Sequence, residues 1–447
     1  MVNLVQERQN IFDRISNILR LREKTFEKIL EREKKKKRIL IYDFGLCTEI
    51  GIRLARDGHE VYYFVPWEDA FPKSSKALIG ENLDGLHRVL NFWDWVDKVD
   101  YIMFFDTYCA DLVDYLRKKG YKVFGAGKSE ILENNRWKMK EIQKALKLPT
   151  QKVELIKGIE SLIEYLKKNK NKWIKINTFR GDIETFHHSE YNTTQAQFLG
   201  ELLVSAGAKA KKLEFVVEDE IGEVEPGYDG FIIDGQYPKM AMYGYERKGI
   251  GYIGKVVPYE QLPQSLKDIN DRLIPVFRKL GGRTFFSTEV RVTKNKQGFL
   301  IDPCVRSPMP VPTAIHLEIW SNLSDFLING AEGNLIDLKP IAKYGAGISF
   351  ESGWAENHWT EIDFPPENRK WIKLRMACKI EDKYYALPGF TSLGSIIGLG
   401  NTIDEAINNV KKVADTLKVK EINYSLSGLE EIKNETIQKG KKYGIPF

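Results

Sequence analysis

The segment Phe285–Arg306, with the sequence FFSTEVRVTKNKQGFLIDPCVR, decides how the second half of this chain is expected to fold. Two short apolar runs flank a polar turn at 294–298, which is the pattern of a β-hairpin. Glu289 lies inside the first run and Asp302 near the end of the second, so a hairpin holds the two acids side by side. Mg²⁺ is commonly bound by one or two carboxylates together with phosphates and water. The pair is therefore a candidate metal site; an edge hairpin with two solvated acids is the alternative.

Length and composition indicate a multidomain protein. The chain has 447 residues, too many for one compact core, and 43% of them are hydrophobic while 29% are charged. No apolar run approaches the length of a membrane span and no signal peptide opens the sequence, so we expect a cytoplasmic protein without a membrane partner. The cysteines form no CxxC pair, which disfavours a zinc site or a disulfide framework; they are Cys47, Cys109, Cys304 and Cys378.

The first 36 residues are expected to form a basic amphipathic helix. Apolar side chains recur near helical spacing at Ile11, Ile15, Ile18, Leu19 and Leu21. The helix could pack on the body of the protein or on a partner, so a homo-oligomer is possible through it. Its end, at 32–38, supplies much of the net charge of +6. We expect a solvated helix end there and do not expect nucleic acid as the main partner.

Between residues 37 and 126, apolar strands alternate with helices. The expected strands are 39–42, 61–65, 101–105 and 123–124, with helices ending near Arg56 and covering 110–119. This alternation predicts a small α/β domain with a parallel sheet and helices on both faces. Its first turn contains glycine but is not GxGxxG, so it predicts no dinucleotide site.

The rest of the chain is expected to form two further units, 127–345 and 346–447. The first should contain helices at 129–146, 262–280 and 314–329, strands at 173–176, 213–217 and 228–234, and the hairpin. A Gly- and Tyr-rich stretch at 242–257 has little periodicity and is interpreted as a binding loop. The second is read as α+β, with strands at 371–380 and 383–387, a turn region to residue 400 and a helix at 402–417.

Several stretches in this order resemble motifs of a known family. They are the run KKGYKVFGAGKSEILENNRWKMKEIQKALKLPTQ at 118–151, WIKI at 173–176, TFRGD at 178–182, EFVVEDEIGEVE at 214–225, the STEVRV and IDPCVR halves of the hairpin, and GNTIDEAINNV at 400–410. Together they resemble the ATP-grasp ligases, and among them phosphoribosylamine–glycine ligase. The resemblance implies a pre-ATP-grasp α/β domain at 37–126, an ATP-grasp domain at 127–345 with a small ATP subdomain at about 150–217, and a C-terminal α+β domain.

The resemblance also implies a cofactor set of ATP with Mg²⁺ or Mn²⁺. The residues that it places around ATP are Arg136, Lys140, Lys175, Arg180, Gly181, Glu218 and Glu225. It gives Glu289 and Asp302 to the metal, and it gives Arg306 and Lys175 catalytic roles on the phosphates. Arg247 and Lys248 are candidates for substrate binding.

Each of these residues also has a plainer interpretation. Lys175 lies in mid-strand and could be an edge-strand lysine that blocks aggregation. Arg136 and Lys140 are four residues apart and share a helix face, which could be a solvated face. The acids near Glu218 could be surface residues, and Arg247 could belong to a flexible charged loop.

The chain also departs from the family pattern. Gly181 is the single glycine where the family has a glycine-rich phosphate loop, and Cys304 stands where it has asparagine. A thiol is a poor ligand for a hard cation such as Mg²⁺. Ser-Pro-Met-Pro follows Arg306 in place of a Gly-Asp-Pro-Glu run. We therefore expect ATP binding to be retained, while the acceptor need not be that of phosphoribosylamine–glycine ligase.

The function that this resemblance implies is an ATP-dependent carboxylate–amine ligase that forms an amide bond through an acylphosphate. Its partners would be a small-molecule carboxylate and a small-molecule amine. One alternative is an ATP-grasp ligase that joins an amino acid to another amine, such as a modified nucleotide or a peptide. The other alternative is a nucleotide-binding scaffold without catalytic activity.

Overall fold

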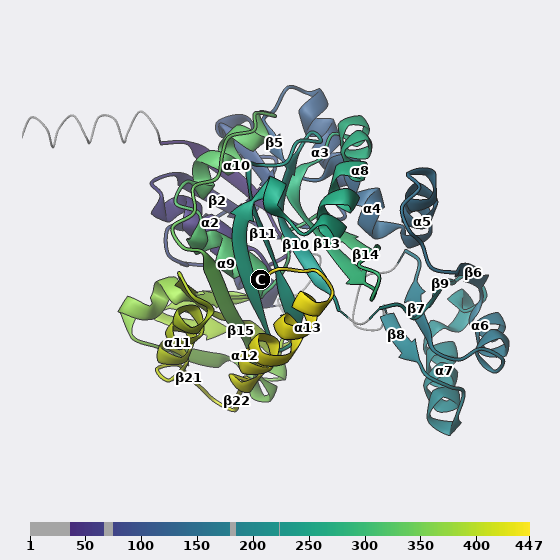
Figure 1. The fold of residues 1–447 in the computed structure, drawn as a ribbon. Helices are drawn as coiled ribbons and strands as arrows, with labels where there is room; N and C mark the ends of the chain where they lie inside the picture. Colours follow the sequence, from purple (N-terminus) through teal and green to yellow (C-terminus); the bar gives the residue numbers. More distant parts are fainter. Residues whose placement is uncertain (1–35, 67–74, 179–184, 223) are drawn as a thin grey trace, which may run out of the picture.

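The structure is a computed structural model that describes residues 36–66, 75–178, 185–222 and 224–447 (Figure 1). The helix expected at 1–36 lies, but for its last residue, outside the described residues, as do Arg180 and Gly181.

The first domain is the expected parallel sheet, in the strand order β3-β2-β1-β4-β5. Its strands are β1 (Arg38–Tyr42), β2 (Glu60–Phe64), β3 (Leu86–Arg88), β4 (Tyr101–Phe104) and β5 (Val123–Phe124), and its helices are α2 (Thr48–Arg56) and α3 (Ala110–Lys118). Ile39 and Ile41 pack into the main core while Leu40 packs into a second core. Both faces of β1 are therefore covered, which explains its continuous apolar run.

A small lobe projects from the side of the molecule (Figure 1). Its antiparallel sheet has the order β6-β9-β7-β8, and its elements are β6 (Val153–Lys157), α6 (Ile159–Leu166), β7 (Lys172–Ile176), β8 (Thr185–His188), α7 (Thr193–Ala206) and β9 (Glu214–Asp219). Ile174, Leu162 and Phe215 belong to a core of its own. This separate core makes the lobe a distinct unit beside the main body.

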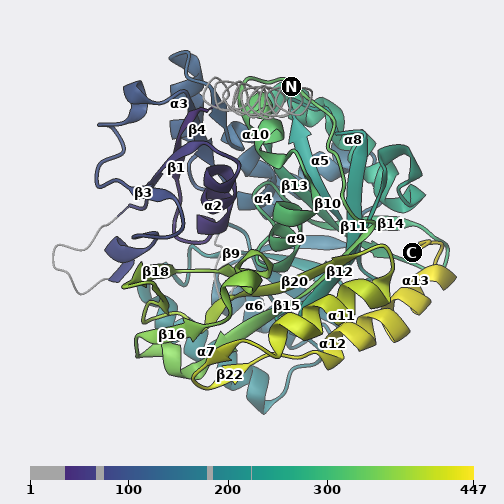
Figure 2. The ribbon, with the colours of Figure 1, turned by 90° about the vertical axis from the view of Figure 1, so that its left-hand side faces the viewer.

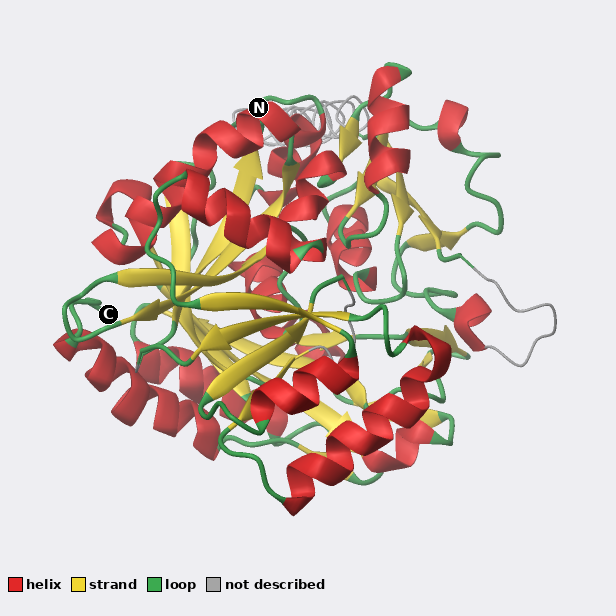
Figure 3. Cartoon of the chain, turned by 90° about the vertical axis from the view of Figure 1, so that its right-hand side faces the viewer, coloured by secondary structure: helices red, strands yellow, loops and turns green. Residues whose placement is uncertain are grey.

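The largest sheet, of nine strands, forms the centre of the molecule, and helices surround it (Figure 3). Its order is β14-β13-β10-β11-β12-β15-β20-β17, with β22 also paired to β15. The strands are β10 (Pro226–Ile233), β11 (Met240–Arg247), β12 (Gly251–Pro258), β13 (Arg283–Val292), β14 (Gly298–Cys304), β15 (Tyr344–Ser352), β17 (Ile372–Leu374), β20 (Ser392–Gly400) and β22 (Ile422–Asn423). β12 pairs with β15, so strands on both sides of residue 345, the boundary expected between the last two units, share one sheet.

The remaining elements follow the expected order. A third antiparallel sheet has the order β18-β19-β16-β21, and the C-terminal helices lie along one side of the molecule (Figure 2). These elements are α8 (Gln264–Leu280), β16 (Thr360–Asp363), β18 (Ala377–Ile380), β19 (Lys383–Ala386), α11 (Ile403–Ala414), β21 (Lys418–Val419), α12 (Ser427–Glu431) and α13 (Ile437–Lys442). Across the described part of the chain, no helix combines the length and hydropathy needed to cross a membrane.

The stretch 242–257 is not a loop, so the sequence-based interpretation was wrong. It forms most of the antiparallel pair β11–β12, in which Gly244 is opposite Gly254. The ring of Tyr252 lies against Gly244, where an added Cβ would come within 2.5 Å of it. The glycines and tyrosines are therefore packing residues of a sheet, and the glycines hide the period of two that would have indicated strands.

Three other expectations need correction. The helix expected at 129–146 is two helices, α4 (Ile131–Asn134) and α5 (Arg136–Ala145). They separate at Asn135, whose side chain accepts a hydrogen bond from the Lys138 backbone N–H and caps α5. The helix expected at 314–329 is likewise divided, into α9 (Val311–Ile319) and α10 (Leu323–Ala331). The turn region before residue 400 is the strand β20.

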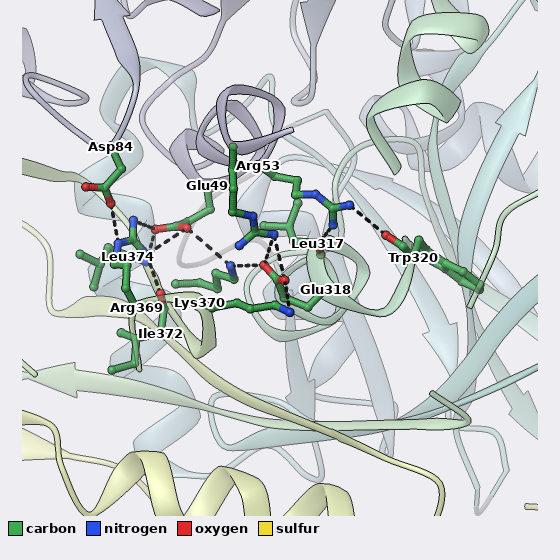
Figure 4. A network of polar contacts seen from close by, with 12 residues as sticks. Glu49, Arg53, Asp84, Leu317, Glu318, Trp320, Arg369, Lys370, Ile372 and Leu374 are labelled. Atoms are coloured by element: carbon green, nitrogen blue, oxygen red, sulfur yellow. Dashed lines mark hydrogen bonds and ion pairs between the residues drawn. The ribbon is translucent and has the colours of Figure 1, made fainter. Parts of the chain in front are cut away.

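A buried network of charges joins the first domain to the C-terminal segment (Figure 4). Glu49 of α2 pairs with Arg369 at 2.9 Å, and it also accepts a hydrogen bond from the backbone of Leu374. Glu318 of α9, whose side chain is 1% exposed, pairs with Lys373 at 2.6 Å and with Arg56 at 2.8 Å. Charges from three segments that are distant in sequence are thus matched where the segments meet.

Candidate active site

A cleft of about 700 Å³ lies between the small lobe and the largest sheet. The lobe contributes side chains from β7 and β9, including Lys175 and Glu218. The sheet contributes side chains from β10 to β14, and the segment after β14 closes one end with Pro308, Met309 and Pro312. A volume of this order is typical of small-molecule sites. Most of the residues singled out in the sequence lie along this cleft; they are Lys175, Glu218, Glu225, Arg247, Lys248, Glu289, Asp302 and Arg306.

The two acids of the hairpin are directly opposite each other. β13 and β14 pair in antiparallel fashion, with Glu289 opposite Asp302, as the sequence predicts. On its other side Glu289 is opposite Gly227 of β10. A Cβ added to Gly227 would meet only ordinary contacts, at 3.5 Å or more. The floor beside the two carboxylates is therefore open, and a ligand can approach them closely.

Lys175 is buried at 3% exposure and links the two sides of the cleft. Its Nζ lies 2.8 Å from Oδ2 of Asp302 and 3.7 Å from Oε2 of Glu218. Burial alone would raise the pKa of Asp302, but Lys175 and Arg136 outweigh it and hold that pKa well below its usual range. β7 lies between β9 and β8 in its sheet, so Lys175 is not on an edge strand and that interpretation is excluded.

Glu289 differs electrostatically from Asp302. Burial raises the pKa of Glu289, and the neighbouring carboxylates Glu225 and Asp302 raise it further, while Lys248 opposes them. The Lys248 ammonium lies 3.4 Å from Glu289. A cation bound between Glu289 and Asp302 would relieve this repulsion.

Arg136 and Lys140 of α5 are buried rather than solvated, and they are not among the residues that line the cleft. Nη1 of Arg136 donates a hydrogen bond to the backbone oxygen of Ile176, at 2.6 Å. Lys140 lies 2.8 Å from Glu218, whose other oxygen accepts a hydrogen bond from Gln151 at 2.7 Å. Burial lowers the pKa of Lys140, and Glu218 partly offsets this effect. α5 thus holds β7 and β9, and with them Lys175.

The other predicted residues lie around the rim and at the closed end. Glu225 pairs with Arg291 at 2.6 Å, and Arg247, an exposed residue, pairs with Glu431. Arg306 lies at the closed end, 2.8 Å from the buried Glu133 and 3.8 Å from Asp106.

Sequence reasoning missed several cleft residues, among them Asp229, Glu246, Tyr252 and Ser287. Asp229 is 6% exposed and accepts a 2.6 Å hydrogen bond from the Tyr252 hydroxyl. Burial in the cleft and the nearby Glu289 raise the pKa of Glu246 to about 8. For Asp229 the usable signal was an acid inside the strand expected at 228–234, whereas for Glu246 the glycines of β11 hid the strand.

Among the described residues, no group of three or more His, Cys, Asp or Glu side chains could hold a metal ion by itself. The Glu289–Asp302 pair instead offers two oxygen donors next to an open floor. Two carboxylates suit a magnesium ion that takes its other ligands from phosphates and water. The site therefore fits a metal that enters with a nucleotide.

No protein-family model matches the chain, and no curated protein matches its sequence. Solved structures do match. Phosphoribosylamine–glycine ligase from Thermotoga maritima is 17% identical, with a TM-score of 0.67, covering 87% of this chain and 98% of that one. The biotin carboxylase domain of 2-oxoglutarate carboxylase from Hydrogenobacter thermophilus, in complex with MgADP, ADP and bicarbonate, is 13% identical, with a TM-score of 0.63, covering 90% and 95%.

L-amino acid ligase from Bacillus licheniformis is 15% identical, with a TM-score of 0.59, covering 88% of this chain and 99% of that one. Each likeness extends over nearly the whole of the other protein. At these identities it establishes a shared fold. The architecture expected from the sequence, an ATP-grasp fold preceded by a small parallel-sheet α/β domain, is confirmed.

Proposed function

We propose that this protein is an ATP-dependent carboxylate–amine ligase. The observation that carries the proposal is the meeting of three charges in one cleft: Glu289 opposite Asp302 on adjacent strands, with Lys175 of the small lobe paired to Asp302. The shared fold supports it, since two of the matching structures are ligases by title and one contains MgADP.

In this proposal ATP lies between the small lobe and the sheet. Lys175 and Lys140 neutralise its phosphates, and Arg136 keeps β7 in place through the oxygen of Ile176. Glu218 and Glu225 are the candidates for the adenine amino group and the ribose hydroxyls. Arg180 and Gly181 are proposed to cover the phosphates; they lie outside the described residues.

Glu289 and Asp302 would hold Mg²⁺ or Mn²⁺. When bound, the metal would supply positive charge that neutralises the transferring phosphoryl group. In this proposal a cation bound to Asp302 would replace Lys175 as the partner of that carboxylate, and the lysine would then pair with a phosphate. Cys304 lies at the end of β14, the strand that carries Asp302, and is not proposed as a metal ligand.

The chemistry proposed has two steps. A substrate carboxylate oxygen attacks the γ-phosphate of ATP, ADP leaves, and an acylphosphate forms. An amine nitrogen then attacks the acyl carbon, the bond to phosphate breaks, and an amide, inorganic phosphate and a proton are released. The side chains position and neutralise charge, and no side-chain nucleophile is needed. Arg306, held by Glu133 at the closed end, is proposed to orient the acylphosphate.

Arg247 and Lys248 remain candidates for binding a substrate carboxylate or phosphate at the rim. Lys248 has a further proposed role, since it lies 3.4 Å from Glu289. A cytoplasmic location, and a homo-oligomer formed through residues 1–36, also remain predictions.

The test is ADP and phosphate release by the purified protein with a panel of carboxylate–amine pairs. We expect release that needs Mg²⁺ and both substrates, and that is lost in Glu289→Gln. The matched control is Glu361→Gln, which removes an exposed charge paired with Lys383 far from the cleft. Strong ATP binding without release on any pair would contradict the ligase proposal and would support a nucleotide-binding scaffold.

A further inference from the structure

Two carboxylates of the cleft have no place in the site proposed for ATP and metal. Asp229 is on β10 and Glu246 is on the neighbouring β11, and both line the cleft. Within the part of the chain that the structure describes, neither carboxylate forms an ion pair. In contrast, the cleft residues Glu225, Glu289 and Asp302 each form an ion pair with a basic side chain.

The position of Asp229 places it next to the reacting centre. Gly227 is opposite Glu289, and two residues further along β10 Asp229 is opposite Ser287. Residues two apart on a strand share a face and lie about 6–7 Å apart. Ser287 is in turn opposite Cys304. Asp229 therefore lies one step beyond the metal pair, toward the end of the cleft that Arg306 and Pro308 line.

The buried carboxylate of Asp229 has no oppositely charged side chain within ion-pair distance among the described residues. Its side chain is 6% exposed, burial raises its pKa, and the group that donates a hydrogen bond to it is the neutral hydroxyl of Tyr252. The Tyr252 hydroxyl also fixes the carboxylate in position, at 2.6 Å. A buried charge is unfavourable unless an opposite charge is placed beside it. A cation bound beside Asp229 would favour its charged form.

The same end of the cleft is unsuited to a second phosphate group beside the acylphosphate. Among the described basic residues that line the cleft, Arg306 is the one at this end. Its guanidinium already forms ion pairs with Glu133, at 2.8 Å, and with Asp106, at 3.8 Å. Because Arg306 is also proposed to orient the acylphosphate, a second phosphate, carried by the acceptor, would face Asp229 without a further basic partner among the described residues that line this end. A phosphorylated acceptor would therefore be repelled.

We propose that Asp229, positioned by Tyr252, recognises the ammonium group of the acceptor, and that the acceptor is an unphosphorylated amine. This inference rests on the proposed ligase function and specifies its second substrate. Asp229 acts as a specificity-determining residue that holds the amine beside the acylphosphate.

The first experiment measures amine binding by calorimetry in the presence of ATP analogue and Mg²⁺. The probes are matched pairs, ethanolamine with O-phosphoethanolamine and serine with O-phosphoserine, together with lysine and putrescine. We expect the parent protein to bind the unphosphorylated members at least about tenfold more tightly, and Asp229→Asn to lose this preference. Tyr252→Phe should show a smaller loss, and Asp337→Asn, which removes an exposed acid paired with Lys239, should show none.

The second experiment separates amine recognition from carboxylate activation. Hydroxylamine is uncharged near neutral pH and traps an acylphosphate without needing an ammonium site. With hydroxylamine and the carboxylate panel, Asp229→Asn should form hydroxamate within about threefold of the parent, while its rate with the preferred amine falls about tenfold or more.

Three results would overturn the inference: tighter binding of the phosphorylated amines by the parent, no binding of any unphosphorylated probe, or loss of hydroxamate formation in a folded Asp229→Asn protein. Amine binding does not require turnover. A parent that binds amines through Asp229 but releases no ADP would therefore refute the ligase proposal and leave the amine site standing.

Discussion

Nζ of Lys175 on β7 lies 2.8 Å from Oδ2 of Asp302 on β14, so a cation of the small lobe neutralises a carboxylate of the central sheet. Both groups are proposed to bind parts of one ligand, the lysine a phosphate and the carboxylate a metal. Without that ligand they satisfy each other. The ion pair keeps two opposite charges matched in a cleft that removes them from bulk water.

Replacing Lys175 by methionine should weaken ATP binding at least about tenfold, because a desolvated charge pair with phosphate is lost. Arg136→Ala should weaken it less, since Arg136 contacts the backbone of Ile176. Lys172→Met is the matched control on the same strand, where the lysine pairs with Asp219. Calorimetric titration with ATP measures all three. Parent-like affinity in Lys175→Met would remove Lys175 from the nucleotide site.

Replacing either acid of the hairpin by its amide should abolish Mg²⁺-dependent turnover while the fold remains intact. Loss of one metal ligand should raise the barrier by several kcal/mol, or about a thousandfold in rate. The measurement is steady-state ADP release by Glu289→Gln and Asp302→Asn, with circular dichroism as the check on folding. Near-normal activity in either variant would mean that the hairpin does not bind the metal.

The charge network of Figure 4 should contribute strongly to stability. Glu318→Ala leaves Lys373 buried without its closest carboxylate, and breaking one partner of a buried pair costs about 3–5 kcal/mol. The midpoint of urea unfolding should therefore fall clearly. Glu361→Ala, at an exposed pair, should change stability by about 1 kcal/mol or less. Equal midpoints for the two variants would show that the network is replaceable.

His316 should make the fold sensitive to acid. It is fully buried, its Nδ1 accepts a hydrogen bond from the Trp320 indole N–H at 2.7 Å, and burial lowers its pKa to about 3. The unfolded chain takes up a proton near pH 6.5 and the folded one does not. Stability from this group is therefore complete above about pH 6.5 and falls below it, by about 1.4 kcal/mol per pH unit, until about pH 3.

The comparison is urea unfolding of the parent, His316→Gln and His358→Gln between pH 7 and pH 4. The exposed His358 serves as the control. The loss of stability with falling pH should be shallower in His316→Gln than in the other two proteins. An identical slope in all three would show that another group dominates the acid response.

Deletion of residues 1–36 should leave ATP binding and turnover in place, because every residue proposed to bind ATP lies at or beyond Arg136. The apolar stripe predicted for this segment suits a contact with a partner, so the deletion should change the assembly state. Light scattering and ADP release on the truncated protein measure the two effects. A folded truncation that no longer binds ATP would contradict the domain boundary.

The local patterns of the sequence were enough to predict the first domain and the hairpin. A strand covered on both faces must be continuously apolar, and Ile39, Leu40 and Ile41 show that pattern. The two apolar runs around one polar turn predict the hairpin and bring Glu289 close to Asp302, while a β-bulge next to Glu289 shifts the register so that the two acids are directly opposite. Both results depend on residues close together in the chain.

Tertiary structure alone decided which charges meet. Lys140 pairs with Glu218 across 78 residues because α5 packs beside the lobe, and Lys175 pairs with Asp302 across 127 residues because the lobe packs beside the sheet. Asp229 lies on β10 and Glu246 on β11, two strands rich in Gly and Tyr. A glycine of β11 makes room for the Tyr252 ring. Spacing along the chain specifies which side chains share a face, but the neighbours across a cleft depend on how whole elements pack, and that packing is set by contacts between segments distant in sequence.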